Sequence, residues 1–259
     1  MNKDLVRQTA TAIAVVATLV VNGLANALPL NNQTTGAISD RFEVHFMPAG
    51  YVFSIWGLIY IGLILFGVFQ ALPAQRENPR LIRTGYLFAL SCAANIVWLF
   101  LWHYEQFPLT IVAMSALLLS LIAIYLRLGI GHVASRPAEK WFVEVPFSIY
   151  LGWITVATIA NATDVLDYLE WNGWGIGAEA WTVIMLLAAT AVAAAVAITR
   201  RDVAYGLVIV WAFAGIALKQ AQTPVVAAAA WSAAGLVVVV LVIGIAFKRR
   251  RRLEPAIAR

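Results

Sequence analysis

The sequence is poor in charged residues, and this scarcity excludes a soluble globular domain. Of its 259 residues, 12% are Asp, Glu, Lys or Arg and 62% are hydrophobic, whereas an average soluble domain carries about 25% charged residues. So few charges cannot cover a surface in water. The fold class that we predict is all-α, a polytopic bundle of transmembrane helices whose solvent is the lipid bilayer.

Cysteine and the common catalytic motifs are also scarce. The single cysteine, Cys92, lies inside an apolar run, which excludes an intramolecular disulfide and a cysteine-based metal cluster. The three histidines (His45, His103 and His132) lie far apart in the chain, without a second ligand at metal-binding spacing. A nucleophile elbow, a P-loop and a dinucleotide fingerprint are missing. We therefore assign no catalytic and no metal-binding residue, and an enzyme is the less favoured class.

Apolar runs between polar breaks predict eight transmembrane helices, because a helix needs about 20 apolar residues to cross a bilayer. The runs cover approximately residues 6–28, 51–72, 83–104, 107–130, 142–164, 179–199, 203–219 and 224–247. The first run could instead be a cleaved signal peptide, since Lys3 and Arg7 precede it and Ala25-Asn26-Ala27 follows its core. A retained helix is the favoured interpretation.

The basic residues predict the orientation of these helices. The formal net charge is +5, and the basic residues form short clusters between apolar runs, which excludes a nucleic-acid partner. Clusters lie at the N-terminus, around residues 76–83, 127–140 and 200–201, and in the tail at 248–252. Cytoplasmic loops are enriched in Lys and Arg, so both termini are expected in the cytoplasm, with the chain in an inner or plasma membrane. Lys219 is the exception to this pattern.

Three of the predicted helices carry aromatic side chains at helical spacing, each with a polar neighbour. The stripes are Phe53, Trp56 and Tyr60; Asn95, Trp98 and Trp102; and Tyr150, Trp153, Ala157 and Asn161. Residues at this spacing share one helix face. If the three faces converge, they form a flat-walled apolar cavity that suits a large planar hydrophobic ligand.

Other roles compete for several of these residues. Tryptophan and tyrosine also anchor helix ends at the membrane surface, and we interpret the following as anchors: Trp102, Tyr104, Trp141, Tyr168, Trp171, Trp174 and Trp181. Trp56, Trp98 and Trp153 lie deeper, where they line a cavity or fill a core. Asn95 could hold two helices together by a hydrogen bond as well as contact a ligand. Glu144 is expected to pair with Lys140.

The connection from Pro29 to Pro48 is long and polar. Loops of about 20 residues are usually functional or disordered, and the regular hydrogen-bonding residues of this one predict an ordered lid over the outer mouth of the bundle.

These motifs resemble the tryptophan-rich sensory protein/translocator protein (TspO/MBR) family, and within it an enlarged eight-helix branch. That family opens its second helix with two prolines and spaced aromatics, and here Ala49 replaces the second proline and Tyr51 the first tryptophan. Asn95-Ile96-Val97-Trp98 resembles the third-helix motif, and the segment from Tyr150 to Asn161 resembles the fifth-helix motif. The resemblance covers roughly residues 5–165.

The resemblance implies a five-helix bundle with a ligand pocket under the first loop. Members of the family bind porphyrins, haem-related tetrapyrroles, sterols and synthetic aromatic compounds, so a tetrapyrrole ligand is expected and no cofactor is required. Carried over residue by residue, the pocket candidates are Tyr51, Phe53, Trp56, Tyr60, Asn95, Trp98, Trp153, Ala157 and Asn161. The expected domains are residues 1–170 with the loop 29–50, three additional helices in 171–248, and a basic cytoplasmic tail at 249–259.

The leading hypothesis is a membrane receptor or carrier for a hydrophobic planar ligand. A secondary transporter and an enzyme that degrades porphyrin under light are the alternatives, and a retinal protein using Lys219 is the least favoured. The small-residue runs Ala191–Val196 and Ala227–Ala230 suit close helix packing or a homo-oligomer interface.

Overall fold

A computed structural model describes the backbone of residues 3–28 and 30–257, and the side chains of these residues except Asn26 and 247–257. The described part consists of helices and their connections. The helices are α1 (Lys3–Ala27), α2 (Thr35–Ser39), α3 (Ile55–Ala71), α4 (Pro79–Thr84), α5 (Leu87–His103), α6 (Phe107–Leu128), α7 (Pro137–Glu139), α8 (Val145–Tyr168), α9 (Ala178–Thr199), α10 (Val203–Lys219) and α11 (Pro224–Ile257).

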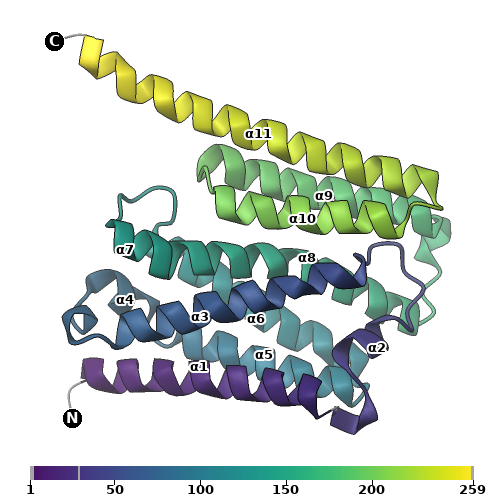
Figure 1. The fold of residues 1–259 in the computed structure, drawn as a ribbon. Helices are drawn as coiled ribbons and strands as arrows, with labels where there is room; N and C mark the ends of the chain where they lie inside the picture. Colours follow the sequence, from purple (N-terminus) through teal and green to yellow (C-terminus); the bar gives the residue numbers. More distant parts are fainter. Residues whose placement is uncertain (1–2, 29, 258–259) are drawn as a thin grey trace.

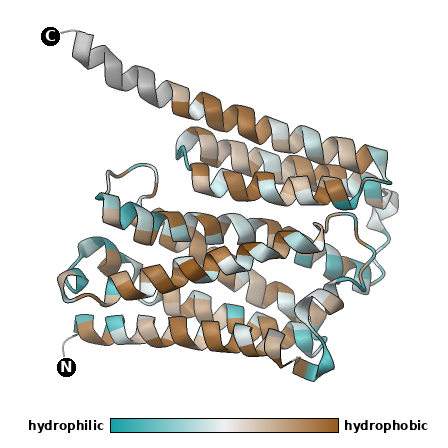
Figure 2. Ribbon diagram, in the orientation of Figure 1, coloured by the Kyte–Doolittle hydropathy of each residue, from teal (hydrophilic) through white to brown (hydrophobic). Residues whose placement is uncertain are grey.

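Eight of these helices are apolar and correspond in order to the eight predicted spans. Six helical segments are long and apolar enough to cross a membrane, and α5 and α10, of 17 residues each, are the shorter apolar helices. The prediction of an all-α polytopic bundle is confirmed. Apolar residues run along the helices, and hydrophilic residues gather at the two ends of the bundle (Figure 2), as a chain spanning a bilayer requires.

The helices lie side by side along a common direction (Figure 1). The start of α1, the short helices α4 and α7, and the end of α11 lie at one end of the bundle, and α2 lies at the other. The basic clusters of the described residues therefore share one end, as the charge pattern predicts, while its assignment to the cytoplasm stays a prediction. The backbone of the basic tail continues α11 to Ile257, and its side chains and residues 258–259 lie outside the described part.

Buried amides attach α1 to its neighbours. The side chain of Gln8 donates to the carbonyl of Gln70 at 2.6 Å, and Gln70 donates back to the carbonyl of Gln8 at 3.2 Å. One turn before its other end, Asn22 Nδ2 donates to Asn95 Oδ1 on α5 at 2.8 Å. Such hydrogen bonds between membrane helices contribute about 0.6–2 kcal/mol each, so α1 packs as a full member of the bundle.

Glu144 does not pair with Lys140. A π-helical turn, Lys140–Glu144, joins α7 to α8 and directs the Glu144 carboxylate to Arg80 of α4, at 2.6 Å. Arg80 also binds Glu139 at 2.9 Å. Glu139 also accepts a hydrogen bond from Asn78 Nδ2 at 2.8 Å. The expectation of an i, i+4 pair failed because a cation from another helix lies closer.

Candidate functional site

The connection 30–50 is an ordered lid across one end of the bundle. Thr34 caps α2 by accepting a hydrogen bond from the Ala37 amide, and Ile38 of α2 is buried against Trp102, Phe107 and Val165. Asn31 Nδ2 donates to the carbonyl of His103 at 3.0 Å. The prediction of an ordered lid over the mouth of the bundle is in keeping with this arrangement.

His103 at the end of α5 holds the lid from both sides of its ring. Its Nδ1 lies 3.1 Å from the carbonyl of Leu30, and its Nε2 lies 3.0 Å from the hydroxyl of Thr35. A carbonyl only accepts, so Nδ1 carries the proton, and in the neutral ring Nε2 accepts from Thr35. At the rim, Glu105 accepts from Gln33 and pairs with Arg41, each at 3.0 Å.

Beneath the lid lies a small cavity, which we call the aromatic pocket. It encloses about 60 Å³ and is lined from the lid, from the 3₁₀ turn Gly50–Ser54, and from α3, α5, α6 and α8. Its residues are Thr35, Ser39, Met47, Pro48, Phe53, Trp56, Trp98, Trp102, Met114, Trp153, Val156, Ala157, Ala160, Asn161 and Asp164. The three aromatic stripes of the sequence thus converge on one space.

The aromatic rings of the pocket hold one another mainly by edge-to-face contacts. Trp153 of α8 meets Phe53 at a centroid distance of 5.6 Å and Trp56 at 6.4 Å, with interplanar angles near perpendicular, 81° and 80°. Trp98 stacks on Trp102 at 5.5 Å and 18°. Such ring pairs contribute about 0.5–1.5 kcal/mol beyond their burial, so the walls are ordered without a ligand.

One polar chain of hydrogen bonds crosses the pocket wall. The indole N–H of Trp98 donates to Asn161 Oδ1 at 2.7 Å, and Asn161 Nδ2 donates to the hydroxyl of Thr110 at 2.7 Å. Asn161 therefore joins α5, α6 and α8 and fixes the plane of the Trp98 ring.

Two other polar groups of the pocket are buried without a hydrogen-bond partner. The indole N–H of Trp153 and the Oδ1 oxygen of Asp164 have none in the described structure, and both residues are 2% exposed. Buried polar atoms are usually paired because an unpaired one costs about 1–3 kcal/mol. One donor and one acceptor in the wall of the same cavity offer two fixed points to a ligand.

The structure places six of the nine predicted residues in this pocket: Phe53, Trp56, Trp98, Trp153, Ala157 and Asn161. Tyr60 lies behind it, stacked on Trp56 at 5.5 Å. Tyr51 is 46% exposed and packs edge-on against Trp211 of α10. Asn95 turns to Asn22 instead of the pocket, in the helix-joining role that the sequence had left open.

Sequence reasoning assigned two pocket residues to the wrong surroundings. Trp102 was interpreted as a surface anchor, yet it is 3% exposed and lines the pocket; its spacing of four from Trp98 was the signal for a shared face. Asp164 was expected at the very end of its helix, in the predicted run 142–164, but α8 continues to Tyr168. Its spacing of three from Asn161 places it on the same face of that helix.

Lys219 and the acidic residues give no support to cofactor chemistry of other kinds. Lys219 is the last residue of α10 and is exposed, whereas a retinal lysine should lie in mid-membrane. Among the residues that the structure describes, no three His, Cys, Asp or Glu side chains gather as a metal site would need.

Comparison with known proteins adds a family to this geometry. A family model described as TSPO-like protein matches residues 8–243. The chain belongs to the TSPO-like protein family. The match extends beyond the segment 5–165 that carries the sequence motifs, so α9, α10 and most of α11 of this TSPO-like protein fall within it. No curated protein and no solved structure matches the chain.

Proposed function

We propose that this TSPO-like protein is a membrane receptor or carrier that holds a hydrophobic planar ligand in the aromatic pocket, with a porphyrin or another tetrapyrrole as the first candidate. The observation that carries the proposal is the convergence of Trp56, Trp98 and Trp153, from three different helices, on one cavity. Flat apolar walls with a few fixed polar groups are typical of sites for aromatic ligands.

The two unpaired polar atoms specify what such a ligand should carry. The indole N–H of Trp153 can donate to an oxygen of the ligand, and Asp164 Oδ1 can accept from an N–H group. A tetrapyrrole has both kinds of group, since its edge holds carboxylates and its pyrrole rings hold N–H bonds, which an open-chain tetrapyrrole can direct outward. Binding would then relieve two buried polar groups at once, which favours the bound state.

The pocket must open to receive a ligand of this size. Sites for drug-sized molecules enclose about 300–1,000 Å³, whereas the aromatic pocket encloses about 60 Å³. The lid supplies part of its lining through Thr35, Ser39, Met47 and Pro48. We infer that the structure represents the closed state, and that displacement of the lid admits the ligand.

Titration of the purified protein with protoporphyrin, followed by the porphyrin absorption band and by tryptophan quenching, tests the proposal. We expect saturable binding that is weakened about tenfold or more in Trp56→Ala and Trp153→Ala. Asp164→Asn keeps the shape of the side chain and should weaken binding less. Trp171→Ala, in the separate cluster of Trp171, Trp174 and Trp181, is the matched control. Absence of saturable binding, or equal affinity in all variants, would remove the proposal.

Transport and light-dependent degradation of the ligand would both begin with this binding step. Flux of porphyrin into proteoliposomes would identify a carrier, and a new absorbing product after illumination, lost in Trp153→Ala, would identify degradation. Binding with neither result leaves a receptor.

A further inference from the structure

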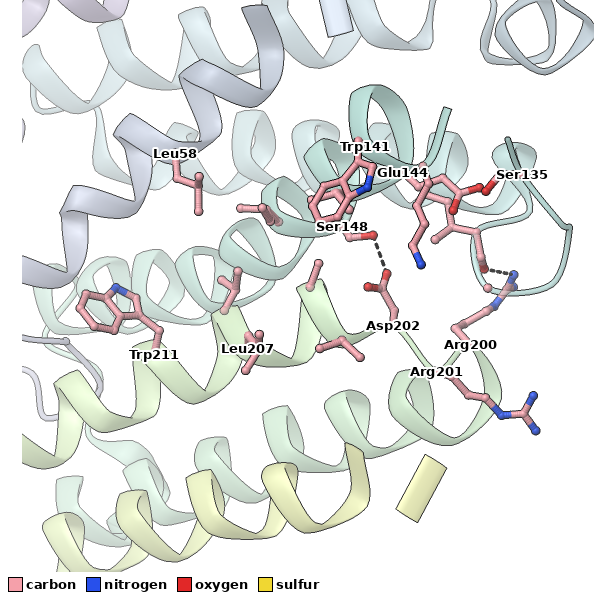
Figure 3. A pocket seen from close by; sticks show the side chains of 18 of the residues that line it. Leu58, Ser135, Trp141, Glu144, Ser148, Arg200, Arg201, Asp202, Leu207 and Trp211 are labelled. Atoms are coloured by element: carbon pink, nitrogen blue, oxygen red, sulfur yellow. Dashed lines mark hydrogen bonds between the residues drawn. The ribbon is translucent and has the colours of Figure 1, made fainter. Parts of the chain in front are cut away.

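A second and much larger cavity lies on the side of the bundle, outside the aromatic pocket. It measures about 910 Å³ and is open to the surroundings of the protein. The floor is α8, and the walls are α3 and α10; Figure 3 shows it with Leu58, Ser148 and Leu207 around the space. We call it the lateral groove.

The groove exists because α10 approaches the remainder of the bundle closely at only some points. Near its end, α10 touches the segment before α3: a Cβ on Gly215 would collide with the side chain of Val52, and Trp211 donates its indole N–H to the carbonyl of Val52 at 3.2 Å. Gly152 lets α10 lie against α8, since a Cβ there would be 3.1 Å from the backbone of Tyr205. Beyond Val52, the space between α3 and α10 stays unfilled.

The walls are apolar over a length that matches one leaflet of a bilayer. From Asp202 to Trp211, α10 rises about 14 Å, and half the hydrocarbon thickness of a bilayer is about 15 Å. Leu58, Leu207 and Trp211 line this stretch and are exposed. Exposed apolar side chains at this depth face lipid, so a hydrocarbon chain can enter the groove from the side.

The polar end of the groove lies where the basic clusters gather, and its acids are already paired. Asp202 caps α10 through the Tyr205 amide and accepts from the hydroxyls of Tyr125, at 2.9 Å, and Ser148, at 2.5 Å. The other lining acid, Glu144, pairs with Arg80, as described above.

The cations at this end form no ion pair among the described residues. Lys140, Arg200 and Arg201 line the groove. Arg200 donates a hydrogen bond to the carbonyl of Ile130 at 3.3 Å and lies over the Tyr125 ring at 5.7 Å from its centroid, and its guanidinium has further N–H groups to offer. Gly131, at φ +83°, allows the loop backbone to lie against Arg200, which holds the residue at the mouth. The end of the groove is therefore a site of unbalanced positive charge.

We propose that the lateral groove binds one anionic phospholipid from the bilayer, with an acyl chain along α10 and the phosphate between Lys140 and Arg200. The charge of the mouth selects an anionic headgroup, and the apolar walls of leaflet length select an acyl chain. A neutral lipid would contact only the apolar walls, and a soluble anion would contact only the basic residues at the mouth.

Native mass spectrometry of the detergent-solubilised full chain tests this proposal. Phosphatidylglycerol and phosphatidylcholine with identical acyl chains are added separately, and the retained adducts are counted. We expect one phosphatidylglycerol to be retained at least tenfold more tightly than phosphatidylcholine. Lys140→Gln and Arg200→Gln should each weaken it about fivefold, because one basic residue near an anionic surface contributes about that factor. Arg83→Gln, at the same end but outside the groove, is the control.

A second pair of variants tests the walls. Ala204→Phe places a ring inside the groove and should abolish the retained lipid, whereas Ala195→Phe, on the exposed side of α9, should not. Equal retention of the two lipids would overturn the proposal, as would equal losses in Arg83→Gln and Arg200→Gln. So would binding of inorganic phosphate or of a fatty acid in place of the phospholipid, or a dimer that closes the groove.

Discussion

The two cavities of this protein differ in size, access and the state of their polar groups. The aromatic pocket encloses about 60 Å³ under a lid, and it contains a buried donor and a buried acceptor without partners. The lateral groove encloses about 910 Å³ and is open, and its acids are already hydrogen-bonded or ion-paired within the protein. Under the two proposals, the pocket would supply specific polar contacts to its ligand, and the groove would supply apolar walls and positive charge.

This difference indicates how each site would exchange its ligand. At about 60 Å³, the aromatic pocket can select by shape and hydrogen bonding, but it must widen first, and the fraction of widened molecules limits its apparent affinity. The lateral groove, at about 910 Å³, is already large enough for a hydrocarbon chain and equilibrates with the surrounding leaflet without such a change. Variants that remove polar groups from each cavity test whether the paired groups stabilise the fold and whether the unpaired groups contribute to ligand binding.

The largest effect is expected from Asp202, at the polar end of the groove. Asp202→Ala removes the cap of α10 and leaves the hydroxyls of Tyr125 and Ser148 without their acceptor. Hydrogen bonds to a charged group contribute about 1.5–3 kcal/mol and a helix cap about 1 kcal/mol. We expect the free energy of unfolding, measured in mixed micelles with increasing dodecyl sulfate, to fall by about 3 kcal/mol.

Porphyrin affinity of the molecules that remain folded should not change in Asp202→Ala, because the residue is outside the aromatic pocket. Asp202→Asn, which keeps one carbonyl oxygen as acceptor, should recover part of the lost stability. An unchanged unfolding midpoint in Asp202→Ala would show that the hydrogen bonds of Asp202 do not stabilise the fold. The distinction between paired, stabilising groups in the groove and unpaired groups in the pocket would then be wrong.

A smaller loss is expected from Asn161, in the wall of the aromatic pocket. Asn161→Ala removes the partners of the Trp98 indole and of Thr110 and should lower the free energy of unfolding by about 2 kcal/mol. It should also weaken porphyrin binding, because the Trp98 ring is no longer held in place. Asn95→Ala is the matched control, since it breaks a buried amide pair outside the pocket. The same affinity in both variants would contradict a role for the Trp98 plane.

Most of the fold could be predicted, because the position of each helix and the face that its aromatic residues share depend on local sequence. Apolar runs gave the eight helices in order, and spacing along three of them placed Phe53, Trp56, Trp98 and Trp153 on faces that converge. Helix ends were less certain: α8 extends past the predicted boundary at 164 to Tyr168, so Asp164 lies inside the helix and not at its end. Boundaries are difficult because polar residues occur inside helices as well as after them.

What the sequence could not give depends on contacts between distant segments. The sequence around Tyr51 does not indicate that its ring contacts Trp211 of α10 and lies outside the aromatic pocket. The pairing of Glu144 with Arg80 joins residues 64 positions apart, and the lateral groove is lined by residues of α3, α8 and α10. The periodicity of a single helix carries no information on how such distant segments pack.

The smallest effect is expected at the rim of the lid, where Glu105 closes the aromatic pocket. Hydrogen bonds from Gln33 and Arg41 lower the pKa of this carboxyl below its ordinary value of 4.5. The lowered pKa means that the contacts contribute fully above about pH 4.5 and are lost as the pH falls through the lower value of the closed lid. Because the pair is exposed, the gain is small. Acidification should therefore loosen the lid only a few-fold.

Amide hydrogen exchange of residues 30–41 at pH 7 and pH 3.5 measures this effect without a ligand. The intrinsic exchange rate also depends on pH, so each value is compared with Glu105→Gln at the same pH. We expect the variant to exchange faster than the unmodified protein at pH 7, and we expect this difference to shrink at pH 3.5, below the ordinary pKa of the Glu105 carboxyl. A constant ratio across pH would show that the rim does not hold the pocket closed. The lid over the aromatic pocket would then be held in place by His103 and by the buried contacts of Ile38.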